Sequence, residues 1–405
     1  MVYGQTVTVD RVEFAGHDRT REDYLRQFVE AKPNRPTTDS LLRLDAQRLQ
    51  NLTPIGQVQH RLDTLDEVTI LTFEVTEVKT LLPIVNLGGI RDNFWFQLGF
   101  TDLNWRGNGS TLSAAYFNND SRHGGHLFYR NPRWRGTPWG FSAALSRWAS
   151  VEPLYFQQGA VNYDYDNNSL GLTVLRNLGY HHQVEAGGTF FVEQYRKSAT
   201  QSLETPPGPD ELTQPKFLTK WEHRGNYLNY HLFYLDGTAW RTTFQNVHNL
   251  MDGTWFHSLQ FQGRHFRRLG KRGNLATRLT LAIATNNNSP FAPFVADSHV
   301  NIRGIGNRID RGTAQIVVNL EYRQTLFENS KWAAQAVAFS DLGTWRNPGG
   351  RLRDLFDSNQ FREFVGGGVR LLNQKWFGAV LRIDYGVDLF NPNQRGLVIG
   401  LGQYF

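Results

Sequence analysis

The sequence of 405 residues contains no cysteine. Without thiols the chain can form no disulfide bond, no thiolate metal site and no cysteine nucleophile. Also missing is any run of about 18 apolar residues, the length that a helix needs to cross a bilayer, and the mean hydropathy is low, at −0.47. These absences exclude a disulfide-stapled domain and argue against a protein that crosses a membrane with helices.

Charge is scarce as well: Asp, Glu, Lys and Arg make up 20% of the residues, against roughly 25% in average soluble domains. Aromatic residues are abundant, at 13%, which is unlike a disordered chain. A polar average with many aromatic residues is typical of a closed membrane β-barrel, whose strands alternate apolar and polar side chains. The first four residues do not resemble a signal peptide, so if the protein is exported, a leader has been removed or replaced.

The first 79 residues differ in pattern from the rest of the chain. Residues 6–14 alternate apolar and polar side chains like a strand. Apolar periodicity then indicates two helices, the second of them capped by Asp39 or Ser40. Two further strands are predicted before Glu77. The order strand, helix, helix, strand, strand predicts a small α+β domain over residues 1–79.

After Lys79 the helical periodicity disappears, and residues 80–405 contain a series of two-faced strands. In the clearest of them, 379–389, apolar residues share one face, while Arg382 and Asp384 lie on the other. A water-soluble sandwich would not bury such a charged face, whereas the lumen of a barrel would hydrate it. We therefore predict a membrane β-barrel, an antiparallel transmembrane barrel of about sixteen strands. The segments centre near Ile84, Leu98, Leu112, His126, Ala144, Tyr163, Phe190, Tyr227, Thr243, Leu259, Leu279, Val318, Ala336, Val369, Ile383 and Leu401.

Motifs of catalysis are absent from the sequence. It contains no Gly-x-Ser-x-Gly, no His-Glu-x-x-His and no phosphate loop. The vicinal His181 and His182 would point to opposite faces of a strand, so they are poorly placed to chelate one metal ion together. We expect no enzymatic activity, no cofactor and no metal.

Basic residues are densest at Arg264, Arg267, Arg268, Lys271 and Arg272. This cluster fits a solvated strand end or turn, and the alternative is a contact with lipid headgroups or lipopolysaccharide phosphates. Other positive charges are scattered, so nucleic acid is not an expected partner.

One connection, residues 285–312, is too long for a tight turn, and loops of this length are usually functional. It carries an arginine beside glycines, and a carboxylate follows on a nearby strand. A loop folded back into the barrel would place the two together, because a guanidinium forks onto a carboxylate. The alternative is that the arginine is an ordinary solvent-exposed loop residue. The loop motif consists of Ile302, Arg303, Gly304 and Ile305, and the strand motif of Phe339, Asp341 and Gly343.

These motifs resemble those of the BamA-like superfamily of outer-membrane β-barrel assembly and translocation proteins. The loop motif is similar to the family's V/I-R-G-F/Y and departs only at Ile305, where the family has an aromatic residue. The strand motif matches F-x-D-x-G, and two earlier segments, 102–109 and 129–138, also resemble family stretches. The matches follow the family's order across nearly the whole chain.

The resemblance implies that Arg303 docks on Asp341 inside the lumen and holds the loop there. It also implies that residues 1–78 form one POTRA module on the periplasmic side, and that Phe405 belongs to a terminal β-signal. Bacterial members typically carry several POTRA modules, whereas this chain has room for one, as in the mitochondrial homologue. We expect an outer-membrane location, in a Gram-negative bacterium or, alternatively, in an organelle.

A weak seam between the first and last strands is expected, because Pro removes a ladder hydrogen bond and Gly weakens a strand. Alternatively, the glycines only accommodate the curvature of the barrel. The seam residues are Pro83, Gly88, Gly89, Gly396, Gly400 and Gly402.

Such a seam favours an insertase that folds unfolded outer-membrane β-barrel clients into the lipid bilayer, helped by POTRA binding and, in some settings, by accessory subunits. The alternatives are a secretion pore for one dedicated partner and an accessory barrel that anchors a larger complex.

Overall fold

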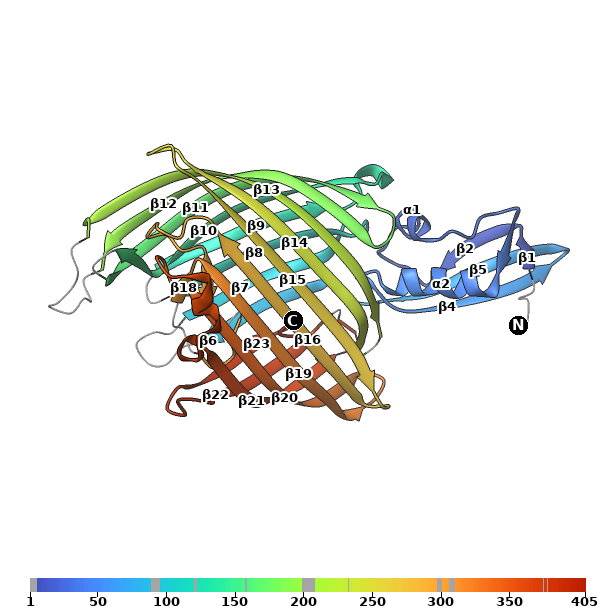
Figure 1. Cartoon of the computed structure of the whole chain (residues 1–405). Coiled ribbons are helices and arrows are strands. Elements are labelled where there is room, and N and C mark those ends of the chain that lie inside the picture. The colour runs from blue at the N-terminus through green and yellow to red at the C-terminus, as the bar shows by residue number, and fades with distance from the viewer. Residues whose placement is uncertain are drawn as a thin grey trace.

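The computed structural model describes residues 6–88, 95–119, 122–156, 159–198, 208–231, 233–296, 301–305, 310–373, 375–376 and 378–405. Figure 1 shows two parts: a small N-terminal unit and a large barrel, with the unit projecting from one end of the barrel. We call this the proximal end and the opposite one the distal end.

The N-terminal unit combines two helices with a three-stranded sheet of order β2-β5-β4, in which β2 and β5 are parallel. A separate ribbon pairs β1 with β3. The strand expected over residues 6–14 is interrupted at Asp10, whose carboxylate accepts the Thr69 backbone N–H at 2.7 Å. The elements of the N-terminal unit are β1 (Thr6–Val9), β2 (Arg11–Ala15), α1 (Glu22–Leu25) with a 3₁₀ turn (Arg26–Phe28), β3 (Arg35–Thr38), α2 (Asp39–Gln50), β4 (Ile55–Leu65) and β5 (Val68–Glu77).

Helix α2 packs one face on the sheet and begins at a side-chain cap. The cap is Thr38 and not Asp39 or Ser40 as predicted: the Thr38 hydroxyl accepts the Leu41 N–H at the helix start. On the inner face, Leu42 and Leu49 are buried against Leu71 and Phe73 of β5 and their neighbours. One modest core thus holds this unit together, as expected for a chain segment of this length.

Sixteen antiparallel strands in the described part of the chain form one closed barrel. Each of the sixteen predicted centres lies on a strand of its own, which confirms the predicted barrel. Its strands are β6 (Leu81–Gly88), β7 (Trp95–Trp105), β8 (Ser110–Asn119), β9 (Arg122–Asn131), β10 (Trp139–Phe156), β11 (Gly159–Leu178), β12 (His182–Lys197), β13 (Glu211–Tyr230), β14 (Leu235–Asn249), β15 (Trp255–Leu269), β16 (Gly273–Ala284), β19 (Ala314–Glu328), β20 (Trp332–Arg346), β21 (Arg362–Asn373), β22 (Val380–Asp388) and β23 (Arg395–Leu401).

Apolar side chains cover the outside of the barrel. On β22, Leu381, Ile383 and Tyr385 are each 37–44% exposed, while the intervening Arg382 and Asp384 are buried inside. The same alternation recurs on β16 and β19. An apolar band of this extent on a closed antiparallel barrel is the lipid-facing surface of a transmembrane barrel. Among the described residues, no helix is long and apolar enough to span a bilayer.

The lumen differs from the expected water-filled channel in one respect. Arg382 and Asp384, which we expected to be hydrated, are only 7% and 0% exposed. Two segments of the chain cover them from inside: the connection between β16 and β19, and the residues that follow β23. The polar faces of these strands therefore meet protein, and their charges must be satisfied by other side chains.

Candidate functional site

The connection between β16 and β19 folds back into the barrel. It contains a short hairpin in which β17 (Phe294–Ala296) pairs with β18 (Asp310–Gly312). Its described tip comprises residues 301–305; the neighbouring segments 297–300 and 306–309 lie outside the described residues.

Arg303 lies at this tip, without exposed surface, and binds Asp341 of β20. Its Nε and Nη2 donate to the two carboxylate oxygens of Asp341 at 2.8 and 2.9 Å. The backbone N–H of Arg303 donates to the same carboxylate at 2.9 Å. The third guanidinium nitrogen, Nη1, donates to Glu321 of β19. The ring of Phe339 lies 3.8 Å from the guanidinium carbon, so the cation also stacks on an aromatic face.

A wider network of charges surrounds this pair. Arg370 of β21 donates to Asp384 at 2.6 and 3.1 Å and to Glu321 at 3.3 Å. Arg323 also donates to Glu321, at 2.5 Å. Strand alternation places Glu321 and Asp384 on polar strand faces, but it assigns neither of them, nor Arg370, to the site. The inward alternation of β21 marks Arg370 as a lumen residue, but only the strand register brings it beside Glu321.

Apolar packing completes the docking of the loop. Ile302 is buried among Val317, Trp345 and Phe364, and Ile305 packs against the same cluster. Ile305, which stands where the resembled motif has an aromatic residue, therefore contributes to this apolar packing. Gly343 is needed beneath Ile302, because a Cβ there would lie 2.7 Å from the Ile302 Cδ1 atom and 2.4 Å from the Trp345 ring.

Three glycines allow the loop backbone to touch the wall. Gly304 has a φ of +96°, and a Cβ on it would lie 2.8 Å from the Gly386 carbonyl oxygen of β22. A Cβ on Gly396 of β23 would in turn meet the Gly304 carbonyl oxygen at 2.8 Å. Gly396, which we predicted as a seam residue, thus also forms part of the loop contact.

The seam between β23 and β6 is thin. Within residues 81–88 and 395–401 the only register pair across it is Ile399↔Leu87, whereas β22 and β23 pair continuously from Leu381↔Leu401 to Val387↔Arg395. A cavity of about 460 Å³ opens beside the seam at Pro83, Leu401 and Gly402.

The other predicted seam residues lie as follows. Gly88 ends β6 and pairs with Trp95 of β7, and Gly89 lies outside the described residues. Gly400 faces the lumen beside β6, since a Cβ on it would lie 2.8 Å from the Arg382 Nη2 atom and 3.3 Å from the Asn86 Oδ1 atom.

Phe405, expected as part of a terminal β-signal, does not lie on a strand of the barrel wall. Strand β23 ends at Leu401, and Gly402, with a φ of +94°, turns the chain inward. Phe405 is buried in the lumen against Phe266 and Ala276. Glycine adopts this backbone conformation without strain, and strand alternation alone does not reveal such a turn.

The segment 102–109 docks the N-terminal unit on the barrel. Asp102 accepts bonds from Arg19 and, at 2.9 Å, from the Thr80 hydroxyl. Asn104 donates to the Thr20 hydroxyl at 3.0 Å. Gly109 packs against Tyr24, and burial raises the pKa of the Tyr24 hydroxyl to about 12, so it stays protonated at neutral pH.

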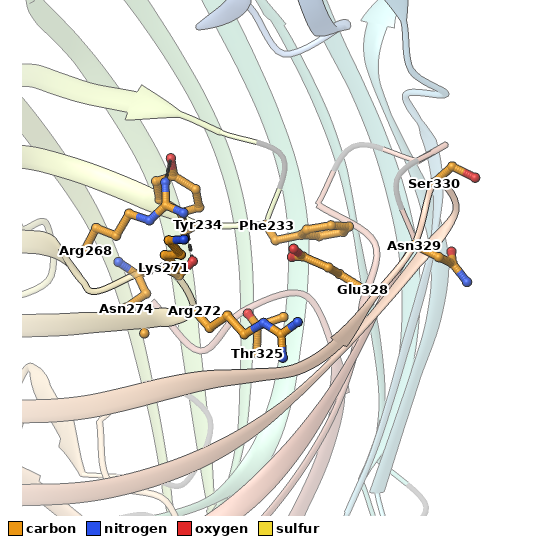
Figure 2. A pocket seen from close by; sticks show the side chains of 11 residues that line it. Phe233, Tyr234, Arg268, Lys271, Arg272, Asn274, Thr325, Glu328, Asn329 and Ser330 are labelled. Atoms are coloured by element: carbon orange, nitrogen blue, oxygen red, sulfur yellow. Dashed lines mark hydrogen bonds between the residues drawn. The ribbon is translucent and has the colours of Figure 1, made fainter.

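Figure 2 shows three members of the basic cluster, Arg268, Lys271 and Arg272, at the turn between β15 and β16. Arg268 stacks on Tyr234, 4.1 Å from its ring centre, and donates to the carbonyl oxygens of Gly270 and Lys271 at 3.2 and 2.8 Å. Arg264 lies on the inward face of β15, the same face as the buried Phe266. The cluster is therefore divided between a structural turn and the lumen.

No protein family and no curated protein matches the sequence. Several solved structures do match the fold. BamA from Haemophilus ducreyi lacking POTRA domains 1–3 is 15% identical with a TM-score of 0.55, over 98% of this chain and 85% of that one. CdiB from Acinetobacter baumannii is 13% identical with a TM-score of 0.56, over 98% and 74% of the two chains. CdiB from Escherichia coli is 11% identical with a TM-score of 0.62, over 97% and 76%. The chain shares the fold of these barrels, which confirms the resemblance to BamA-like proteins at the level of fold.

Proposed function

We propose that this protein is a non-enzymatic insertase that helps other β-barrel proteins fold into the outer membrane of a Gram-negative bacterium. The observation that carries the proposal is the seam: within residues 81–88 and 395–401, β6 and β23 share one register pair, whereas β22–β23 and β6–β7 form continuous ladders. An unpaired backbone group in lipid costs several kcal/mol. A client strand that adds to an edge at this seam would avoid that cost by β-augmentation.

The N-terminal unit would act as a POTRA module on the periplasmic side. Its sheet order leaves β4 at one edge, which could pair with an unfolded client before insertion. The basic turn at Arg268 and Arg272 lies near the proximal end, since its neighbours Phe233 and Tyr234 also border a cavity with Gln50 of the N-terminal unit. With the N-terminal unit in the periplasm, the proximal end lies at the periplasmic leaflet. The turn then meets phospholipid headgroups, because lipopolysaccharide lies in the opposite leaflet.

Cross-linking the seam tests the proposal cleanly, because the natural chain has no cysteine. Asn86 and Gly400 face each other next to the Ile399↔Leu87 pair. We expect oxidation of N86C/G400C in liposomes to abolish most of its activity. The folding rate that it supports for an unfolded barrel client should fall at least tenfold. Reduction should restore the rate.

The matched control is S146C/S169C, at positions directly opposite each other in the continuous β10–β11 ladder with their hydroxyls 2.6 Å apart. Oxidation of this pair should leave the rate unchanged. An open-seam protein that accelerates no client, or a cross-linked seam that works as well as the free one, would contradict the proposal.

The fold is equally that of CdiB, so a secretion pore for a dedicated partner is the second candidate. A specific feature favours it: the loop tip lies inside the lumen and is held there by side chains, so a translocating chain could displace it. Depletion in cells followed by outer-membrane proteomics separates the candidates. Broad loss of barrels supports the insertase, loss of one exported protein supports the pore, and co-purification of a stable complex with little activity alone supports an anchoring role.

A further inference from the structure

The residues that follow β23 enter the lumen and stay there. Gly402 turns the chain, its N–H donating to the Val380 carbonyl at 2.7 Å. Arg370 Nε donates to the Gln403 side chain at 3.3 Å. Tyr404 and Phe405 are only 7% and 9% exposed. We call residues 402–405 the lumen segment.

The far end of the lumen segment packs on strands that are distant from the seam in the order of the sheet. Phe405 belongs to a buried cluster with Leu228 of β13, Phe266 of β15 and Ala276 of β16. Between β16 and β23 the sheet contains β19, β20, β21 and β22. The segment therefore links the seam strand to the inner wall of β13–β16.

Arginines hold the same two aromatic residues. The guanidinium of Arg278 lies 5.2 Å from the Tyr404 ring and 5.0 Å from the Phe405 ring. Arg323 donates to the Phe405 carbonyl at 3.2 Å. Desolvated cation–π contacts of this kind contribute more than exposed ones, so the segment is fastened by charge as well as by apolar burial.

Tyr404 also connects the lumen segment to the docked loop. Its ring lies 4.5 Å from the guanidinium carbon of Arg303 and 5.1 Å from that of Arg382. The loop cation that binds Asp341 therefore covers the segment as well. The lumen segment and the docked loop therefore meet at one aromatic side chain, Tyr404.

We propose that the lumen segment is a tether that positions β23 from inside the barrel, in place of the ladder that β23 lacks with β6. Tyr404 and Phe405 are its anchoring residues. Their release lets β23 move away from β6 and widens the seam edge. The inference rests on the proposed function only in that a widened seam serves a client; the tether itself is a property of the free protein.

Spin labels across the seam test the tether without any client. The cysteine-free chain allows V85C/L397C, two outward positions on β6 and β23 that are 36% and 55% exposed. We expect a narrow distance distribution in the otherwise natural protein. In Tyr404→Ala/Phe405→Ala the mean should lengthen by about 5 Å, roughly one strand spacing, and the distribution should broaden.

Two controls exclude a general loss of structure. The pair L145C/L170C, directly opposite across β10 and β11, should keep its distance in the same variant. Tyr385→Ala/Phe390→Ala removes the same two ring types from exposed positions and should leave the seam distance unchanged.

An unchanged V85C/L397C distance in the Tyr404→Ala/Phe405→Ala variant would overturn the tether, and so would a change in both label pairs alike. If the seam widens but no client folds faster, the tether stands and the proposed insertase fails. If insertion depends on the seam while this distance never changes, the tether alone fails.

Discussion

Alanine in place of Asp341 is expected to destabilise the docked loop by about 3–5 kcal/mol, the usual cost of removing one partner from a buried ion pair. The Asp341 carboxylate accepts three bonds from Arg303, and neither residue has exposed surface. Without it, the carboxylates that remain near the Arg303 cation are Glu321, which also binds Arg323 and Arg370, and the more distant Asp384, at 3.8 Å. Hydrogen–deuterium exchange of residues 301–305 should accelerate about 100-fold or more, since 1.4 kcal/mol corresponds to a factor of ten.

A double-mutant cycle with Arg303→Ala isolates the pair itself. Residues that share a buried network usually show a coupling of about 0.5–3 kcal/mol. The control is the Arg147–Asp166 pair, also 2.9 Å apart but with the arginine side chain 57% exposed, for which about 0–1 kcal/mol is expected. Arg303→Lys should behave almost like Arg303→Ala, because an ammonium cannot form the two-pronged bond. Additive effects of Arg303→Ala and Asp341→Ala would refute the Arg303–Asp341 ion pair as the contact that holds the docked loop.

The barrel was predictable from the sequence because its environment imposes a strict two-residue period. Lipid outside and polar groups inside select opposite side chains at successive positions, as at Leu381, Arg382 and Ile383. This signal survives in every strand without reference to any other strand. The loop around Arg303 could be located for a similar local reason, since its length and its glycines interrupt the alternation.

Contacts between strands were not predictable in the same way. Alternation gives the face of a residue but not the register with its neighbour. The register pairs Asn319 with Asp341 and Glu321 with Phe339, and thereby fixes which carboxylates meet Arg303. Arg370 joins them from a third strand. A single sequence holds no direct record of these distances, so the wider network emerged only in the structure.

The expectation that water in the lumen hydrates Arg382 and Asp384 was wrong for a related reason. It treated each strand face by itself, as if only water could meet Arg382 and Asp384. Gly402 leads the lumen segment inward and the long loop enters from the distal end, so protein covers both residues. The turn at Gly402 depends on one positive φ, and many glycines in a barrel sequence could adopt it.

Gly386 provides the second large effect that we expect, because it tests the fit of the loop and not its charge. A Cβ on Gly386 would lie 2.5 Å from the Arg303 carbonyl oxygen and 3.3 Å from the Gly304 Cα atom. Both are backbone atoms, so the loop itself must move. Gly386→Ala should destabilise the docked loop by about 1–3 kcal/mol, the range for overpacking at a tight contact, with faster exchange over residues 301–305.

Gly367 is the matched control for Gly386. It lies on the adjacent strand β21, opposite Tyr385 and exposed to the outside, where a Cβ would meet only the Val337 carbonyl oxygen at 3.3 Å. Gly367→Ala should leave loop exchange unchanged. If Gly386 acts through the docked loop, Asp341→Ala should cost less in the Gly386→Ala background than alone, because a displaced loop no longer brings Arg303 fully onto its carboxylate. Strict additivity of Gly386→Ala and Asp341→Ala would mean that the glycine contact and the ion pair hold the loop independently, and that the loop can leave the wall in parts and not as one unit.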